Sequence, residues 1–433
     1  MRGVAIPEKT EDFTADPVEL FFDLAFVFAF SQLVARLIHD PTWEGVGEAA
    51  LLFLLLWLPW TQFTWSANAV SGNGRVVRAL FLVGTAASVP MAASVTTAFE
   101  GGGLIFAMSL ASILVLALAM LTLSFDRGTA QRGSAARYSA FNVAGMLVLV
   151  VGGLLTGQAR IVAWALAFLT VLAGTKWASR GAWIVRIGHF AERHGLIIIV
   201  ALGEVIVAIA APVVGELEEA GGLSGPTLGA LIGVGAFGGL LWWSYFDRPS
   251  PAWEHRFATL DDRARAMYVR DVYTYAHAPT VAGIILSAAA LEEIALHPTE
   301  PLPGAFATML GCGLALYLTG VIVGIGRSHR TLVLERLVAM VLLVGLLPLT
   351  RHLDGVVVLV GVDVLLLATL VAEHLRVEGR SAVEARRPGG RARPRHSLQL
   401  LRSDRKTYPI HARCASRMAR GVLKKYPRTE GTL

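Results

Sequence analysis

Twelve long apolar stretches constrain the fold of this chain more than any other feature. A membrane-spanning helix needs about 20 consecutive apolar residues, because the hydrocarbon core is about 30 Å thick and each residue adds about 1.5 Å. The chain is 55% hydrophobic and 16% charged, whereas a soluble domain has about 25% charged residues. We therefore predict an all-α membrane protein of about twelve transmembrane helices, near residues 19–38, 46–66, 79–98, 104–124, 139–157, 160–178, 195–213, 228–246, 272–294, 305–325, 332–350 and 355–375.

The charged residues divide between this apolar body and a basic C-terminal tail. Residues 376–433 hold sixteen Lys and Arg against four Asp and Glu, a net charge of +12. Because the whole chain carries +6, the preceding residues carry −6. We expect the tail to be disordered or to lie on anionic membrane lipid. It shows no folded nucleic-acid-binding module, so we expect no nucleic-acid partner.

The basic residues of the short loops predict the orientation of the chain. Lys and Arg concentrate in cytoplasmic loops. Sixteen of them lie in the connections after even-numbered spans, against three beside odd-numbered connections. We therefore predict a protein of the cell inner (plasma) membrane with both termini cytoplasmic.

Landmarks that recur in order predict an internal duplication. Glu19 opens the first span and Glu192 precedes the seventh, and Pro90 and Pro279 lie in the third and ninth. Two copies of six spans would be parallel, related by an axis along the membrane normal. The alternative is chance recurrence of common membrane residues. The duplication divides the chain into a cytoplasmic segment 1–18, repeats 19–178 and 179–375, and the tail 376–433.

Two carboxylates open the first span. Glu19 and Asp23 are four residues apart and so share one face of a helix, and Ser31 returns to nearly that face. Carboxylates in membrane helices usually face a protein interior or a watery cavity. The alternative is that both are solvated at the membrane interface, near the positive end of the helix dipole.

Glu204 is the most informative single residue. It lies about ten residues inside the seventh span, with apolar residues on both sides. An isolated ionised carboxylate there costs at least about 2.5 kcal/mol, so the residue should be protonated, paired or bound to a cation. The alternative is a neutral Glu hydrogen-bonded between helices. Gly203 beside it predicts a close helix approach.

The residues just before the seventh span are more ambiguous. The residues are His189, Glu192, Arg193 and His194. His and Glu at this spacing could bind a metal, but no HExxH pattern is present. We favour a solvated cytoplasmic cap with Glu–Arg pairing. The sequence also lacks Walker A, dinucleotide-binding and CxxC motifs, so we predict no metal and no cofactor.

A third polar group precedes and enters the ninth span. Arg270 and His277 are seven residues apart and share a face, and Asp271 and Tyr275 are four apart on a neighbouring face. Pro279 removes a backbone donor and should loosen the helix around Tyr275. A His beside a broken helix could be a proton or ion site, or it could simply bond to a freed carbonyl. We expect the ninth helix to extend into the cytoplasm.

Three ordered stretches resemble the bacterial low temperature requirement protein A family. They are ELFFDLAFV at 19–27, ERHGL through ALGE at 192–204, and RD through YAHAPTVAG at 270–283. Ala25 is a mild departure from the family pattern. The resemblance implies a multi-pass membrane protein and a role in growth in the cold, and implies location and topology more than a reaction. More loosely, an acid after aromatics in a first helix is similar to a family of endolysosomal potassium channels.

Three functions are compatible with these residues. The first is an ion- or proton-coupled transporter or channel, in which Glu204 is the deep site and Glu19, Asp23, Asp271 and His277 form a polar entry. The second is a membrane-embedded enzyme acting on lipid through Glu192, His194, Asp271 and His277. The third is a sensor or scaffold whose basic tail binds anionic lipid. The sequence names neither a small substrate nor an oligomeric state.

Overall fold

The computed structural model describes residues 15–70, 74–126, 128–178, 180–181, 183–220, 222–329, 333–350 and 352–385. Within them the secondary structure is helical, apart from one isolated bridge between Pro301 and Asp354. The elements are α1 (Pro17–His39), α2 (Trp43–Ala69), α3 (Arg75–Ala93), α4 (Gly103–Leu123), α5 (Ala130–Leu154), α6 (Gly157–Ala178), α7 (Ile187–Ala220), α8 (Gly225–Phe246), α9 (Pro249–Ala258), α10 (Asp262–Val269), η1 (Arg270–Ala276), α11 (His277–Leu296), α12 (Gly304–His329), α13 (Leu334–Thr350) and α14 (Gly355–Ala385).

Ten helical stretches in the described part of the chain are long and apolar enough to cross a membrane. They coincide with ten of the predicted spans. The other two predictions, 195–213 and 332–350, fall on α7 and on α13, which is 17 residues long. The all-α, multi-pass architecture is therefore confirmed, whereas the number twelve stays a prediction.

The described residues up to Leu370 form one compact unit, and those from Val371 belong to a second. The predicted repeat boundary at residue 178 stays a prediction. Residues 1–14 and 386–433 lie outside the described residues. This places most of the predicted N-terminal segment and of the basic tail beyond what the structure describes.

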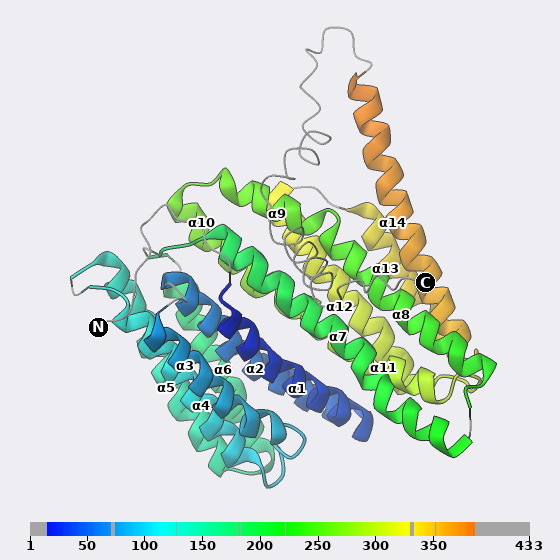
Figure 1. Cartoon of the computed structure of the whole chain (residues 1–433), viewed down its shortest axis with the longest axis horizontal. Helices are drawn as coiled ribbons and strands as arrows, with labels where there is room; N and C mark the ends of the chain where they lie inside the picture. Colours follow the sequence, from blue (N-terminus) through cyan, green and yellow to red (C-terminus); the bar gives the residue numbers. More distant parts are fainter. Residues whose placement is uncertain are drawn as a thin grey trace, which may run out of the picture. The chain divides into compact units, whose positions relative to one another are not determined.

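The centre of the first unit is made by α1, α7 and α11, which pack against one another (Figure 1). On one side α3 packs on α1, and α4, α5 and α6 follow it in chain order. On the other side α12 packs on α11, and α8 packs on α7. Helices of the two sequence halves therefore meet at α1, α7 and α11.

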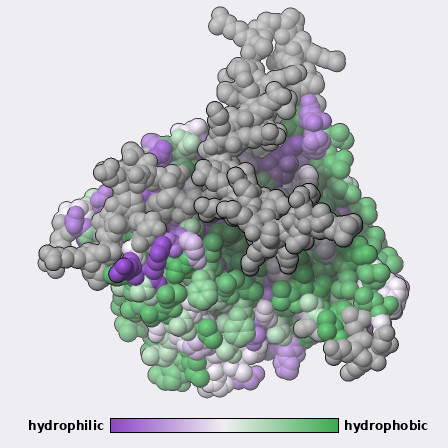
Figure 2. Space-filling view, in the orientation of Figure 1, coloured by the Kyte–Doolittle hydropathy of each residue, from purple (hydrophilic) through white to green (hydrophobic). Residues whose placement is uncertain are grey.

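Large apolar side chains also cover the outside of these helices. Leu147 on α5 is 66% exposed, Ile232 on α8 is 65% exposed and Val341 on α13 is 68% exposed. Figure 2 shows hydrophobic residues over much of the visible face of the described chain. Exposed apolar area of this extent fits contact with lipid rather than with water.

The first helix begins with a capping box that fixes its acidic first turn. Asp16 accepts a hydrogen bond from the N–H of Val18, and Glu19 accepts one from the N–H of Asp16. Pro17 occupies the first helical position, where its missing N–H costs nothing. The cap holds the Glu19 side chain at the start of the helix, beside the end of α7 that begins at Ile187.

Glycines set the closest helix approach, between α11 and α12. A Cβ on Gly283 would overlap the Gly313 carbonyl oxygen, and a Cβ on Gly320 would overlap the Thr280 hydroxyl. At Gly203 an added Cβ would meet nothing within 4 Å. The prediction that Gly203 marks a close helix approach is therefore wrong.

The polar segment before the ninth span is helical, as predicted. The helices α10, η1 and α11 follow one another without a break from Asp262 to Leu296. Over Arg270–Ala276 the backbone is a π-helix, which includes Tyr275. The loosening of the helix that we predicted from Pro279 is confirmed. Proline has no N–H to donate to the carbonyl four residues earlier, which favours a departure from α-helical geometry.

Candidate functional site

Two carboxylates of α1 meet a basic face of α7 inside the protein. Glu19 Oε2 lies 2.8 Å from His189 Nε2 and 3.7 Å from Arg193 Nη1. Asp23 Oδ1 accepts a 2.8 Å hydrogen bond from Trp60 Nε1 and lies 3.0 Å from Arg193 Nη2. These five residues, Glu19, Asp23, Trp60, His189 and Arg193, are called the acid–base cluster below.

The acid–base cluster is closed to solvent. Glu19, His189 and Arg193 are 0% exposed, and Asp23 is 2% exposed. The alternative that placed Glu19 and Asp23 at a solvated interface is therefore wrong. The prediction that we favoured for His189 and Arg193, a solvated cap, is wrong as well. A sequence window cannot reveal this burial, because the groups that pair lie about 170 residues apart.

The formal charges of the five residues in the cluster are unequal. Arg193 supplies one positive charge, and two ionised carboxylates would supply two negative ones. Because a buried net charge is costly, a proton on one carboxyl would make these charges equal.

Glu192 lies beside this cluster and does not pair with Arg193 in the way we expected. Its Oε2 accepts a 2.7 Å hydrogen bond from the backbone N–H of Ala15. Arg193 instead pairs with Glu19 and Asp23 across the helix interface. The role of Glu192 in the structure is to join the start of α1 to α7.

Next to the cluster, two histidines and three larger aromatic residues form an aromatic layer. His194 and His277 have ring centroids 5.0 Å apart, and the ring of Tyr273 stacks on His277 at 5.4 Å. Trp253 lies 5.3 Å from His277, and Tyr245 lies 5.6 Å from it. The layer joins the cluster through His194, whose ring is 4.9 Å from that of Trp60.

Hydrogen bonds indicate which nitrogen of each histidine carries a proton. His277 Nδ1 lies 2.8 Å from the Val272 carbonyl oxygen, and His194 Nδ1 lies 2.8 Å from the Phe190 carbonyl oxygen. Carbonyls only accept, so both Nδ1 atoms donate. His277 Nε2 then accepts from the Tyr245 hydroxyl at 2.6 Å.

His194 Nε2 is left as a buried acceptor without a hydrogen bond in the described part of the chain. The bond of His277 to Val272 fits the alternative that this histidine bonds a main-chain carbonyl. The hypothesis that it is a proton or ion site stays a prediction.

Arg270, Asp271 and Tyr275 form a separate group on the π-helix. Arg270 Nε donates to Asp271 Oδ1 at 2.8 Å, and Arg327 Nε donates to Asp271 Oδ2 at 3.0 Å. The Arg270 guanidinium lies over the Tyr275 ring at 5.5 Å. Two arginines thus share one carboxylate on the outer side of η1.

Glu204 pairs with α1 and not with the other acidic residues of the predicted site. The Ser31 hydroxyl donates to Glu204 Oε2 at 2.6 Å, and Glu204 is 1% exposed. Its Oε1 is buried and makes no hydrogen bond in the described part of the chain. Ser31 and Glu204 are called the deep pair below. The bond fits the alternative that Glu204 is held between helices.

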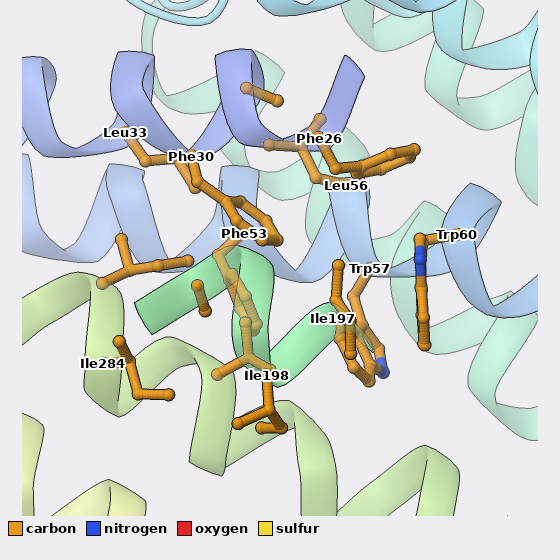
Figure 3. Close-up of a cluster of buried hydrophobic side chains, with 14 of the residues drawn as sticks. Phe26, Phe30, Leu33, Phe53, Leu56, Trp57, Trp60, Ile197, Ile198 and Ile284 are labelled. Atoms are coloured by element: carbon orange, nitrogen blue, oxygen red, sulfur yellow. The ribbon is translucent and has the colours of Figure 1, made fainter. Parts of the chain in front are cut away.

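Apolar side chains separate the deep pair from the acid–base cluster. On α1 they lie between Asp23 and Ser31, about 12 Å apart along a helix. On α7 they lie between His194 and Glu204, about 15 Å apart. Figure 3 shows how these side chains from α1, α2, α7 and α11 meet. The apolar layer consists of Phe26, Phe30, Phe53, Leu56, Ile197, Ile198 and Ile284, all buried.

Several members of the site were not singled out for chemistry in the sequence. Trp60, Tyr245 and Trp253 are aromatic residues, which are common in any membrane protein. Trp57 and Trp60, three residues apart within α2, were a usable signal, since a buried indole N–H needs an acceptor. Among the described residues, no group of three or more His, Cys, Asp or Glu is arranged to hold a metal ion.

Fold and site together define an all-helical, multi-pass membrane protein with ionisable side chains buried between its helices. Residues 14–371 match the family model of the bacterial low temperature requirement A protein. The chain belongs to this family. It is also similar to an uncharacterized protein of Rhizobium meliloti (strain 1021), at 29% identity over 385 residues, which cover 86% of this chain and 91% of that protein. No solved structure matches the chain.

Proposed function

We propose that this protein is an ion- or proton-coupled transporter or channel, inserted in the plasma membrane with both termini cytoplasmic. The observation that carries the proposal is the arrangement on the α1–α7 interface. Two buried sets of ionisable groups, the acid–base cluster and the deep pair, lie on either side of the apolar layer. Ionisable residues inside a membrane are costly and commonly mark ion or proton pathways.

Each polar set offers a group that can take up a proton. In the acid–base cluster a proton on one carboxyl would make the formal charges equal, and His194 Nε2 beside the cluster has a lone pair without a partner among the described residues. In the deep pair, Glu204 Oε1 also has a lone pair without a partner among the described residues. A proton or small cation moving between the sets would have to cross the apolar layer, which gates by excluding water.

The contact between Ser31 and Glu204 supports the proposed duplication. These residues are 173 positions apart, the same separation as Glu19 and Glu192, which we aligned as landmarks of the two repeats. Equivalent residues of two parallel repeats meet where they lie next to the axis that relates them. We therefore propose that the axis passes between α1 and α7, near the deep pair.

The test of the proposal is flux in proteoliposomes with Glu204→Gln. The amide keeps the size of the side chain and can still bond to Ser31, but it cannot take up or release a proton. We expect the wild type to show flux driven by a H⁺, Na⁺ or K⁺ gradient, and Glu204→Gln to lose most of it.

The matched control is Glu44→Gln, which makes the same chemical change at an exposed residue in the first turn of α2. We expect this variant to retain wild-type flux. Full activity of Glu204→Gln would remove the deep pair from the mechanism. If folded wild-type protein shows no flux under any gradient, the transport proposal fails.

A further inference from the structure

Asp363 is a carboxylate inside a membrane span that belongs neither to the acid–base cluster nor to the deep pair. It lies eight residues after Gly355, the first residue of α14. That is about 12 Å along the helix, near the middle of a hydrocarbon core about 30 Å thick. In the described part of the chain Asp363 makes no hydrogen bond and no ion pair, and its Oδ1 is buried. A carboxyl at this depth has to be protonated or paired with a cation.

The carboxyl lies where the buried side of α14 meets its lipid-facing side. Residues three or four apart are neighbours on a helix surface. On one flank of Asp363, Leu359 and Leu366 are 0% and 2% exposed. On the other flank, Val360 and Leu367 are 51% and 52% exposed. Asp363 itself is half-buried, so molecules dissolved in the surrounding lipid can reach it.

The neighbouring helix at this point is α8, which presents small side chains. Asp363 Oδ2 lies 3.8 Å from the position that a Cβ on Gly233 would take, and both residues belong to the first compact unit. Ala236, three residues further along α8, is exposed, and Ile232 is 65% exposed. Asp363 therefore lies at the lipid-facing edge of the contact between α8 and α14, which is called the α8–α14 edge below.

The surroundings of the carboxyl favour an organic cation over a metal ion. Ca²⁺ takes about six to eight oxygen ligands, and Mg²⁺ keeps several waters. In residues 228–243 of α8 and 355–368 of α14, Asp363 supplies the only side-chain oxygens. The other side chains of these two segments are apolar, so they are complementary to hydrocarbon groups. An organic cation that dissolves in the bilayer combines a positive charge with an apolar surface.

We propose that the α8–α14 edge binds lipophilic organic cations from the bilayer. The positive charge lies at the Asp363 carboxylate, and the apolar groups lie against Ala236, Val360 and Leu367. The site is on a different helix interface from the acid–base cluster and the deep pair, which lie between α1 and α7. It adds a binding activity that the proposed ion pathway does not include.

The test is equilibrium binding of radiolabelled tetraphenylphosphonium to the purified full chain in lipid nanodiscs, without an ion gradient. We expect one saturable site. Asp363→Asn should weaken binding at least about tenfold, because an amide leaves the cation without a counter-charge in hydrocarbon. Asp363→Glu keeps the charge and should retain most of the binding. Tetraphenylborate has the same shape and the opposite charge, and it should not compete.

Two matched controls separate the α8–α14 edge from the rest of the surface. Asp354→Asn makes the same change at an exposed residue just before α14 and should bind as the wild type does. Ala236→Trp adds bulk at the edge and should weaken binding severalfold. Ala368→Trp adds the same bulk at an exposed residue five positions from Asp363, on a different face of α14, and should leave binding unchanged.

Three results would overturn the proposal. The first is wild-type binding by Asp363→Asn, which would mean that the residue is a neutral carboxyl held at a helix contact. The second is equal competition by tetraphenylborate, and the third is equal weakening by Ala236→Trp and Ala368→Trp. Each of these measurements is made without a gradient, so failure of the transport proposal would leave this one standing.

Discussion

Arg193 is the residue on which the buried charges of the site depend. It lies 3.0 Å from Asp23 and 3.7 Å from Glu19, and it is 0% exposed. A buried ion pair contributes little compared with apolar residues of the same shape, but losing one partner leaves the other charge without compensation. The cluster is therefore sensitive to single substitutions.

Arg193→Met should lower the free energy of unfolding by about 3–5 kcal/mol, because Glu19 and Asp23 lose the arginine that both of them contact. The double variant Asp23→Leu with Arg193→Met should lose less than the sum of the two single changes, since it removes both charges. Thermal unfolding of the purified protein measures both effects.

The matched comparison is the ion pair between Arg78 and Asp16, in which the arginine side chain is 49% exposed. Arg78→Ala should cost at most about 1 kcal/mol, because solvent screens the pair. Equal losses for Arg193→Met and Arg78→Ala would mean that the buried arginine contributes no more to stability than the half-exposed one.

At the scale of elements, α11 and α12 pack closely in the described chain because glycines lie at their contact. Gly283 and Gly313 face each other across it, and an added Cβ would overlap main-chain atoms of the opposite helix. Main-chain atoms cannot rotate away as the end of a flexible side chain can. Small residues of this kind let membrane helices approach closely.

Gly283→Ala should therefore destabilise the protein by about 1–3 kcal/mol, as overpacking does. Gly203→Ala is the matched control, because it introduces the same methyl group into a membrane helix where nothing lies within 4 Å. This control should be neutral or gain up to about 1 kcal/mol in helix propensity. A neutral Gly283→Ala in unfolding measurements would show that α11 and α12 can separate at no cost.

The sequence predicts the elements of this fold much better than it predicts the partners of the site. Apolar runs and capping residues act within about 20 residues, so the helix positions and the loosened segment before Pro279 follow from them. The pairing of Asp23 with Arg193 and of Ser31 with Glu204 depends on how α1 packs on α7. No local sequence pattern predicts that packing. This is why we expected Arg193 to be solvated and could not name the partner of Glu204.

At the scale of the whole molecule, the proposed transport activity depends on the apolar layer between the two polar sets. Its side chains come from four helices, so it is not a property of any single element (Figure 3). An apolar constriction blocks ions because water is excluded from it. The proposed transport activity requires this layer to become wet for part of each cycle.

Ile197→Thr should make the layer easier to hydrate and raise passive ion leak in proteoliposomes severalfold. The matched control is Ile199→Thr, two residues along the same helix, where the side chain is 48% exposed on the outer face. The control should leave the leak unchanged. Equal leak in both variants would argue that the layer is packing alone and does not gate anything.

The π-helix over Arg270–Ala276 also changes how insertions and deletions act on this chain. A π-helical turn holds one residue more than the α-helical turn it replaces. Deleting one residue inside an ordinary membrane helix rotates everything beyond it by about 100°, because each residue turns the helix by that angle. Here the same deletion can be absorbed by returning the segment to α-helical geometry. Deletion of a single residue disrupts most membrane helices. This stretch can accommodate such a deletion without breaking the helix.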